Sequence, residues 1–221
     1  NGTDTLKMYG TYAAANMPVN ITNVEVLDLV AAGDANVDLS NWTKAATGIS
    51  KVVVENGALI SGKTITTTTG QSLSLSTGAA GVATAGNVTW AASATDTSLD
   101  LTLNGYQGGT GVTPVALTIT GAAATTQNIA STTAANKVST LTLGAQTNKV
   151  VVTGDKALTV STDLVSSGGA TVLKTVDASA TTGGVNIALA ATTNAAFAFT
   201  GGSGNDLLSA STGANGRADV L

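Results

Sequence analysis

The stretch SLSLST at residues 72–77 decides the fold class, together with SLDLTL at residues 98–103. In both stretches leucine alternates with a polar residue, which is the period of a β-strand that buries one face. Similar runs, such as KVVVEN at residues 51–56 and KVVVTG at residues 149–154, are rich in valine, which suits a pleated and half-buried surface. The alternation therefore predicts an all-β protein.

Fourteen short runs of this kind follow one another along the chain, separated by Gly, Asn, Asp, Ser and Thr, which favour turns. They lie at residues 24–29, 36–41, 51–56, 64–69, 72–77, 87–92, 98–103, 115–120, 140–145, 149–154, 157–162, 172–179, 185–190 and 196–201. Helical signals are limited to single turns at residues 12–16 and 40–46. Residues 104–113 and 121–137 are predicted to be loops, and we expect the second loop to leave the main stack of strands.

Many short strands with regular turns are typical of a sandwich, a barrel or a solenoid. Aromatic residues make up 3% of the 221 residues, whereas small aliphatic and hydroxyl side chains are abundant and suit a narrow solenoid interior. A weak internal repeat points the same way, because VDLS at residues 37–40 recurs as VDAS at residues 176–179. We therefore predict a parallel β-solenoid over residues 1–200 that continues into residues 201–221, with a β-sandwich as the alternative.

The composition excludes several classes of function. The chain has no Cys and no His, so thiol chemistry, disulfides and imidazole ligands are impossible. The net charge of −4 argues against binding to nucleic acid, and no run of about 20 apolar residues predicts a membrane span. The few lysines are scattered, and no acidic pair is flanked by aromatic residues, so we do not expect an enzyme.

The most specific motif is GGSGNDLLS at residues 201–209, which matches the calcium-binding nonapeptide GGxGxDxUx. Glycines permit positive φ and so turn backbone carbonyls inward, and a carboxylate adds hard oxygen ligands for Ca²⁺. A degenerate second copy follows at residues 213–221. The predicted calcium ligands are Gly202, Gly204, Asn205, Asp206 and Asp219.

Other acidic residues are weaker candidates for ion binding. Asp34, Asn36 and Asp38 alternate along the chain, so their side chains would share one face of a strand, and Asp96 and Asp100 form a looser group. For Asp38 and Asp177 we predict a different role, in which the carboxylate caps a turn by accepting backbone N–H groups.

The motif at residues 201–208, GGSGNDLL, resembles the RTX proteins that bacteria export by type I secretion. The VDxS segments and the Cys-free strands rich in Thr, Ala and Gly are similar to the calcium-dependent surface-layer (S-layer) proteins and large adhesins of Gram-negative bacteria. This resemblance implies a secreted structural protein that binds Ca²⁺ and self-assembles into a two-dimensional lattice on the cell surface.

The resemblance also implies partners and an alternative. The principal partner would be further copies of the chain, and a region outside this sequence would attach the lattice to a cell-surface polysaccharide. We expect the export signal to lie outside this sequence as well. The alternative function is a segment of a large RTX adhesin that mediates surface attachment.

Overall fold

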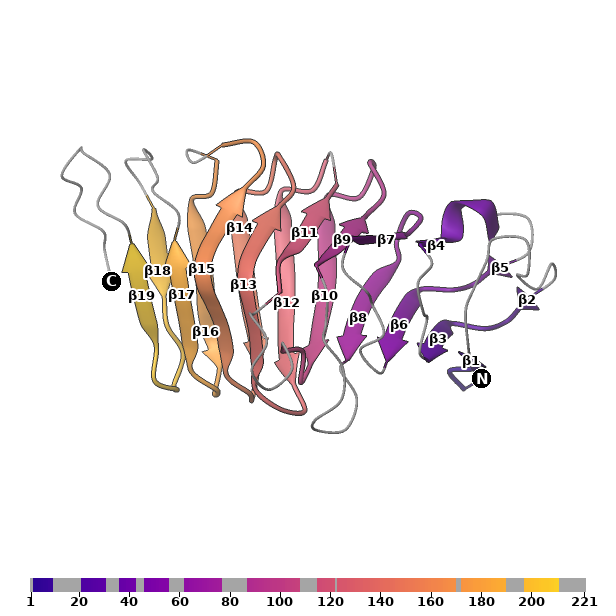
Figure 1. The fold of residues 1–221 in the computed structure, drawn as a ribbon, viewed down its shortest axis with the longest axis horizontal. Helices are drawn as coiled ribbons and strands as arrows, with labels where there is room; N and C mark the ends of the chain where they lie inside the picture. Colours follow the sequence, from indigo (N-terminus) through magenta and orange to yellow (C-terminus); the bar gives the residue numbers. More distant parts are fainter. Residues whose placement is uncertain are drawn as a thin grey trace.

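The computed structural model describes residues 2–9, 21–30, 36–42, 46–55, 62–76, 87–107, 115–121, 123–169, 172–189 and 197–210. The described residues contain no α-helix, and their strands pair in parallel from one end of the molecule to the other. Figure 1 shows the strands stacked side by side along the long axis, with β1 (Thr5–Tyr9) near one end and β19 (Leu207–Ala210) at the other. The predicted β-solenoid is confirmed, and the alternative of a β-sandwich is wrong.

Two parallel sheets contain most of the strands. The nine-stranded sheet consists, in order, of β1 (Thr5–Tyr9), β3 (Val26–Val30), β6 (Lys51–Glu55), β8 (Ser72–Ser76), β10 (Ser98–Asn104), β12 (Thr126–Thr132), β14 (Lys149–Gly154), β16 (Thr175–Thr181) and β18 (Ala198–Thr200). The eight-stranded sheet consists of β4 (Val37–Asp38), β7 (Lys63–Thr66), β9 (Val88–Ala91), β11 (Leu117–Thr120), β13 (Asn136–Leu143), β15 (Leu158–Ser166), β17 (Val185–Leu189) and β19 (Leu207–Ala210). A third pair joins β2 (Ile21–Thr22) to β5 (Ala46–Thr47).

The chain visits the two large sheets alternately, so that one strand of each sheet and the turns between them make one coil. The spacing of successive coils varies, since Thr5 pairs with Val26, 21 residues on, whereas Ser98 pairs with Thr126, 28 residues on. This variation explains why the sequence shows only a weak repeat.

Aliphatic side chains form continuous ladders inside the solenoid. One ladder in the nine-stranded sheet consists of Leu27, Val52, Leu73, Leu101, Ile129 and Val152, each paired in register with the next. A ladder in the eight-stranded sheet consists of Val88, Leu117, Leu141, Leu164 and Leu189. All of these residues are buried, and each large one contributes about 1.5–3 kcal/mol of transfer free energy.

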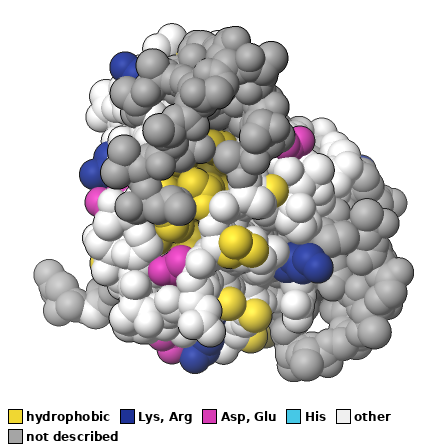
Figure 2. All heavy atoms as spheres, turned by 90° about the vertical axis from the view of Figure 1, so that its left-hand side faces the viewer, with side chains coloured by type: hydrophobic (Ala, Val, Ile, Leu, Met, Phe, Trp, Pro, Cys, Tyr) yellow, Lys and Arg dark blue, Asp and Glu magenta, His cyan; other side chains and the backbone are white. Residues whose placement is uncertain are grey.

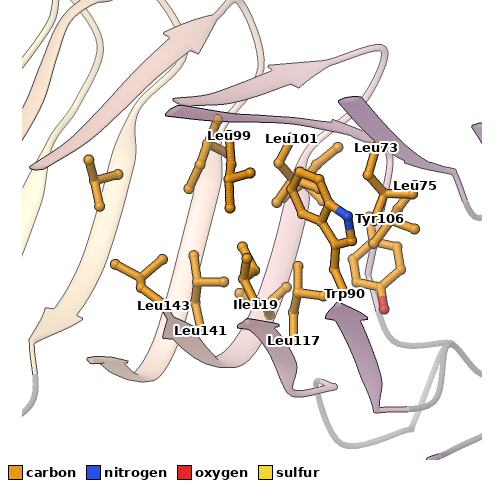
Figure 3. Packing of buried hydrophobic residues seen from close by; sticks show 14 of the residues in the cluster. Leu73, Leu75, Trp90, Leu99, Leu101, Tyr106, Leu117, Ile119, Leu141 and Leu143 are labelled. Atoms are coloured by element: carbon orange, nitrogen blue, oxygen red, sulfur yellow. The ribbon is translucent and has the colours of Figure 1, made fainter. Parts of the chain in front are cut away.

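The two sheets face each other across this core. In Figure 3 the leucines of β8 and β10 point toward Leu117, Ile119, Leu141 and Leu143 of the opposite sheet. Trp90 of β9 is fully buried, and its Nε1 donates a hydrogen bond of 2.9 Å to Oγ1 of Thr67. A narrow interior of this kind holds one layer of side chains from each sheet, which is why aromatic residues are scarce.

The prediction that residues 121–137 leave the stack is wrong. Residues 126–132 form β12, which pairs with β10 on one side and β14 on the other. Two inward positions of β12 are polar, namely Gln127 and Ser131, and this polarity hid the strand in the sequence. Both side chains are satisfied inside, because Gln127 donates to the carbonyl of Leu99 at 3.1 Å and Ser131 donates to the carbonyl of Ala157 at 3.1 Å.

The predicted strand at residues 36–41 is shorter than expected. Only Val37–Asp38 pair with a neighbouring strand, and Leu39–Trp42 form a 3₁₀ turn that overlaps the helical turn predicted at residues 40–46. The change follows from Asp38, whose Oδ1 accepts the backbone N–H of Ser40 at 2.9 Å and bends the chain out of the strand. The other predicted helical turn, at residues 12–16, lies outside the described residues.

We predict an unusual response to the substitution Tyr106→Phe. The Tyr106 side chain is buried, its hydroxyl has no hydrogen-bond partner among the described residues, and burial raises its pKa well above the usual range. Removing an unpaired buried hydroxyl should leave the free energy of unfolding unchanged or raise it by about 1 kcal/mol, as measured by urea denaturation.

The matched control is Thr67→Val, which replaces a hydroxyl that has a hydrogen-bond partner with a methyl group of similar size. It leaves the indole N–H of Trp90 without its partner, so we expect a loss of about 1–3 kcal/mol. Equal losses in the two variants would contradict the assignment of Tyr106 as unpaired.

Candidate metal centre

The nonapeptide turn at residues 201–206 connects the last two described strands, β18 and β19. β18 pairs with β16 and β19 pairs with β17, so the turn closes the coil at the carboxyl-terminal end of the stack. Figure 2 looks onto this end of the molecule and shows apolar side chains exposed there, with acidic and basic side chains close by. The turn borders a groove of about 600 Å³ whose lining includes Phe199, Leu207 and Leu208.

Both carboxylate oxygens of Asp206 accept hydrogen bonds from the backbone. Oδ2 accepts the N–H of Gly202 at 2.8 Å within the same turn, and Oδ1 accepts the N–H of Val185 at 2.8 Å, at the start of β17 in the preceding coil. Hydrogen bonds to a charged acceptor are stronger than those between neutral groups. Asp206 therefore joins its own turn to the neighbouring coil.

The glycines of the motif are needed for a reason that differs from the one predicted. The glycines with positive φ in the described residues do not include Gly202 or Gly204, so positive φ does not explain either one. Instead, a Cβ atom at Gly202 would lie 2.2 Å from the carbonyl oxygen of Thr181, and one at Gly204 would lie 2.5 Å from the amide nitrogen of Gly184. Successive turns approach so closely that only glycine fits between them.

Asp38 and Asp177 cap turns, as predicted. Oδ1 of Asp38 accepts both the N–H and the hydroxyl of Ser40, and Oδ1 of Asp177 accepts the N–H of Ser179 at 3.2 Å and its hydroxyl at 2.7 Å. The cap at Asp177 lies in β16, where the register with β14 shifts. In both VDxS segments the Asp carboxylate thus caps a local turn by accepting hydrogen bonds from the serine two residues later.

The other acidic candidates also accept hydrogen bonds from N–H groups. Asp96 accepts the N–H of Gly70 with both oxygens at 3.1 Å, and Oδ1 of Asp100 accepts from Nδ2 of Asn128 at 2.6 Å. Oδ1 of Asn36 accepts the N–H of Thr64 at 3.0 Å, and Asp34 lies outside the described residues. Over the described ranges, the structure brings no three acidic side chains together in a group that would hold a metal ion.

Two further asparagines, which the sequence analysis missed, have the same kind of contact. Oδ1 of Asn87 accepts the N–H of Ala116 at 2.9 Å, and Oδ1 of Asn136 accepts the N–H of Tyr106 at 2.5 Å. The signal that could have found them is an asparagine at the start of a run of alternating residues, as in Asn87-Val88.

The described part of the turn does not fit a Ca²⁺ ion by itself. Calcium takes six to eight oxygen ligands, whereas the described turn has one carboxylate, which already accepts two N–H groups, and can add only its backbone carbonyls and the side chain of Asn205. Gly202, Gly204 and Asn205 lie in this turn beside Asp206, but Asp219 lies outside the described residues. Further oxygen ligands would have to come from residues 211–221 or from another chain.

We expect the substitution Gly202→Ala to lower the free energy of unfolding by about 3 kcal/mol, because the new methyl group overlaps the carbonyl of Thr181. The control is Gly70→Ala, where φ is +78° but the space around Cβ is empty, so only the backbone cost of about 1–2 kcal/mol applies. Urea denaturation in the presence of a chelator measures both. Equal losses would show that the approach of the two turns does not demand glycine.

The cap at Asp177 predicts a specific acid dependence of stability. The hydrogen bonds from the hydroxyl and N–H of Ser179, aided by Lys149, hold the pKa of the Asp177 carboxyl below its usual value. This contribution is present above the unfolded-state pKa of about 3.9 and is lost as the pH falls through the folded-state pKa. Asp177→Asn keeps an acceptor oxygen but does not titrate, so its free energy of unfolding should fall less between pH 5 and pH 2. An unchanged acid profile would contradict the role of Asp177.

Among the residues that the structure describes, no helix has the length and apolar character needed to cross a bilayer. No family model matches the chain, and no curated protein or solved structure is detectably similar to it. Its function is therefore inferred from the residues and geometry described above.

Proposed function

We propose that this chain is a structural segment of a secreted bacterial S-layer protein that binds calcium and self-assembles into a lattice on the cell surface. The observation that carries the proposal is the continuous stack of parallel coils, in which both large sheets run along the molecule (Figure 1). A stack of this kind is an elongated body whose shape is fixed by its backbone hydrogen bonds. An elongated body of fixed shape suits a structural component of a cell-surface layer.

The outer face of the eight-stranded sheet supports close packing between identical copies. Thr64, Thr89, Thr118 and Thr142 occupy equivalent positions on four successive strands, and their side chains alternate with buried neighbours and so point outward. Only 10% of all residues are charged. A regular face of hydroxyl and methyl groups brings no like-charge repulsion when one copy approaches another.

The calcium part of the proposal depends on the nonapeptide and on the resemblance that it carries. The proposed ligands are Gly202, Gly204, Asn205 and Asp206 in the last described turn, completed by Asp219 and by oxygen atoms of a further coil. Bound Ca²⁺ would supply positive charge between acidic turns and so hold coils or neighbouring copies together. The nonapeptide also supports secretion, because it is the motif shared with exported RTX proteins.

Electron microscopy of the purified protein tests the proposal. One sample contains about 5 mM CaCl₂, a concentration at which weak extracellular calcium sites are occupied, and the other contains a chelator. We expect ordered two-dimensional sheets in calcium and dispersed particles in chelator. Magnesium at the same concentration is the control, because Mg²⁺ demands a tighter octahedral shell.

Particles that stay monomeric in calcium and bind cells or glycans would favour the adhesin segment. Particles that neither assemble nor bind calcium, with calcium binding measured by titration calorimetry, would overturn the proposed function.

A further inference from the structure

We propose that Asp206 is a metal-independent clamp between the last two described coils, in a structural position that asparagine fills elsewhere in the same sheet. The coil that ends at Ala210 would then be held without calcium. This inference goes beyond the proposed function and does not depend on lattice formation.

Asp206 lies one residue before its paired strand, as two asparagines of the same sheet do, although it accepts an N–H of the preceding coil and they accept an N–H of the following coil. Asn186 pairs with Leu207, so Asp206 and Val185 stand opposite each other one residue before the paired positions. At that point the carboxylate accepts the N–H of Val185 at 2.8 Å. The side chain thus provides an acceptor just where the register of β17 and β19 begins.

Asn36 and Asn87 occupy the same position in their own strands. Val37 pairs with Ile65, and Asn36, one residue earlier, accepts the N–H of Thr64 at 3.0 Å. In the same way Val88 pairs with Leu117, and Asn87 accepts the N–H of Ala116 at 2.9 Å. Each contact joins two adjacent coils at the start of their paired strands.

Two of these three clamps are amides, so the position requires an acceptor oxygen and not a negative charge. A residue selected only as a calcium ligand would not need to aim its oxygens at the N–H groups of Val185 and Gly202. The two carboxylate oxygens of Asp206 accept these two N–H groups, each at 2.8 Å. The second bond, to Gly202, is the feature that distinguishes Asp206 from asparagine, because an amide side chain has only one acceptor atom.

Amide hydrogen exchange in chelator, followed by NMR, tests the clamp directly. In the wild-type protein we expect the amides of Val185 and Gly202 to be protected without calcium. Asp206→Ala should raise the exchange rate of both by about tenfold or more, because each loses its acceptor. Asp206→Asn should keep the protection of Val185 and lose that of Gly202.

Asn87→Ala is the matched control, since it removes the equivalent clamp far from the nonapeptide. It should raise exchange at Ala116 and leave Val185 unchanged, and Asn87→Asp should restore the protection of Ala116. If Asp206→Ala fails to fold, the comparison of wild type with Asp206→Asn gives the answer by itself.

The proposal is overturned if Val185 and Gly202 exchange freely in chelator and become protected only in calcium, because Asp206 would then act as a metal ligand first. It is also overturned if Asp206→Ala leaves both exchange rates unchanged. Lattice formation is scored separately on the same samples. Loss of sheets in Asp206→Asn with Val185 still protected in chelator supports the clamp and leaves the S-layer role intact.

Discussion

The parallel pairing of each coil with the next is the constraint from which the rest of the structure follows. Paired strands lie about 4.7–4.9 Å apart, so every inward side chain rests directly on its counterpart in the neighbouring coil. Only side chains that stack on similar ones can fill the interior, and the ladder from Leu27 to Val152 is the result. The close spacing also leaves no room for a Cβ atom where turns meet, as at Gly202.

The same spacing determines what the polar residues do. A side chain at the end of a strand lies within hydrogen-bonding distance of the next coil, and a backbone N–H there has lost its strand partner. Asn36, Asn87 and Asp206 each accept such an N–H group. Side chains of residue types typical of loops therefore hold the turns together. Asp206 of the nonapeptide is one of them.

The proposed surface role and the proposed clamp place different demands on the carboxyl-terminal turn. A calcium site would stabilise this turn only where Ca²⁺ is present, whereas the clamp at Asp206 would hold the turn without metal. A carboxylate that accepts two N–H groups without metal and also ligates Ca²⁺ would satisfy both demands. The uncharged threonine face is common to either arrangement, because it depends on strand register alone.

The sequence alone determined the all-β class, most strand positions and the capping role of Asp38 and Asp177, because alternation and turn chemistry are local properties. Residues 126–132 were predicted to be a loop because Gln127 and Ser131 are polar. In the structure both side chains are buried and donate hydrogen bonds to carbonyls of neighbouring segments. Only the tertiary structure decided which coils pair, why the nonapeptide glycines are needed and where the oxygens of Asp206 point. The contacts of Gly202 with Thr181 and of Asp206 with Val185 each join residues 21 positions apart, and they form only when the coils stack.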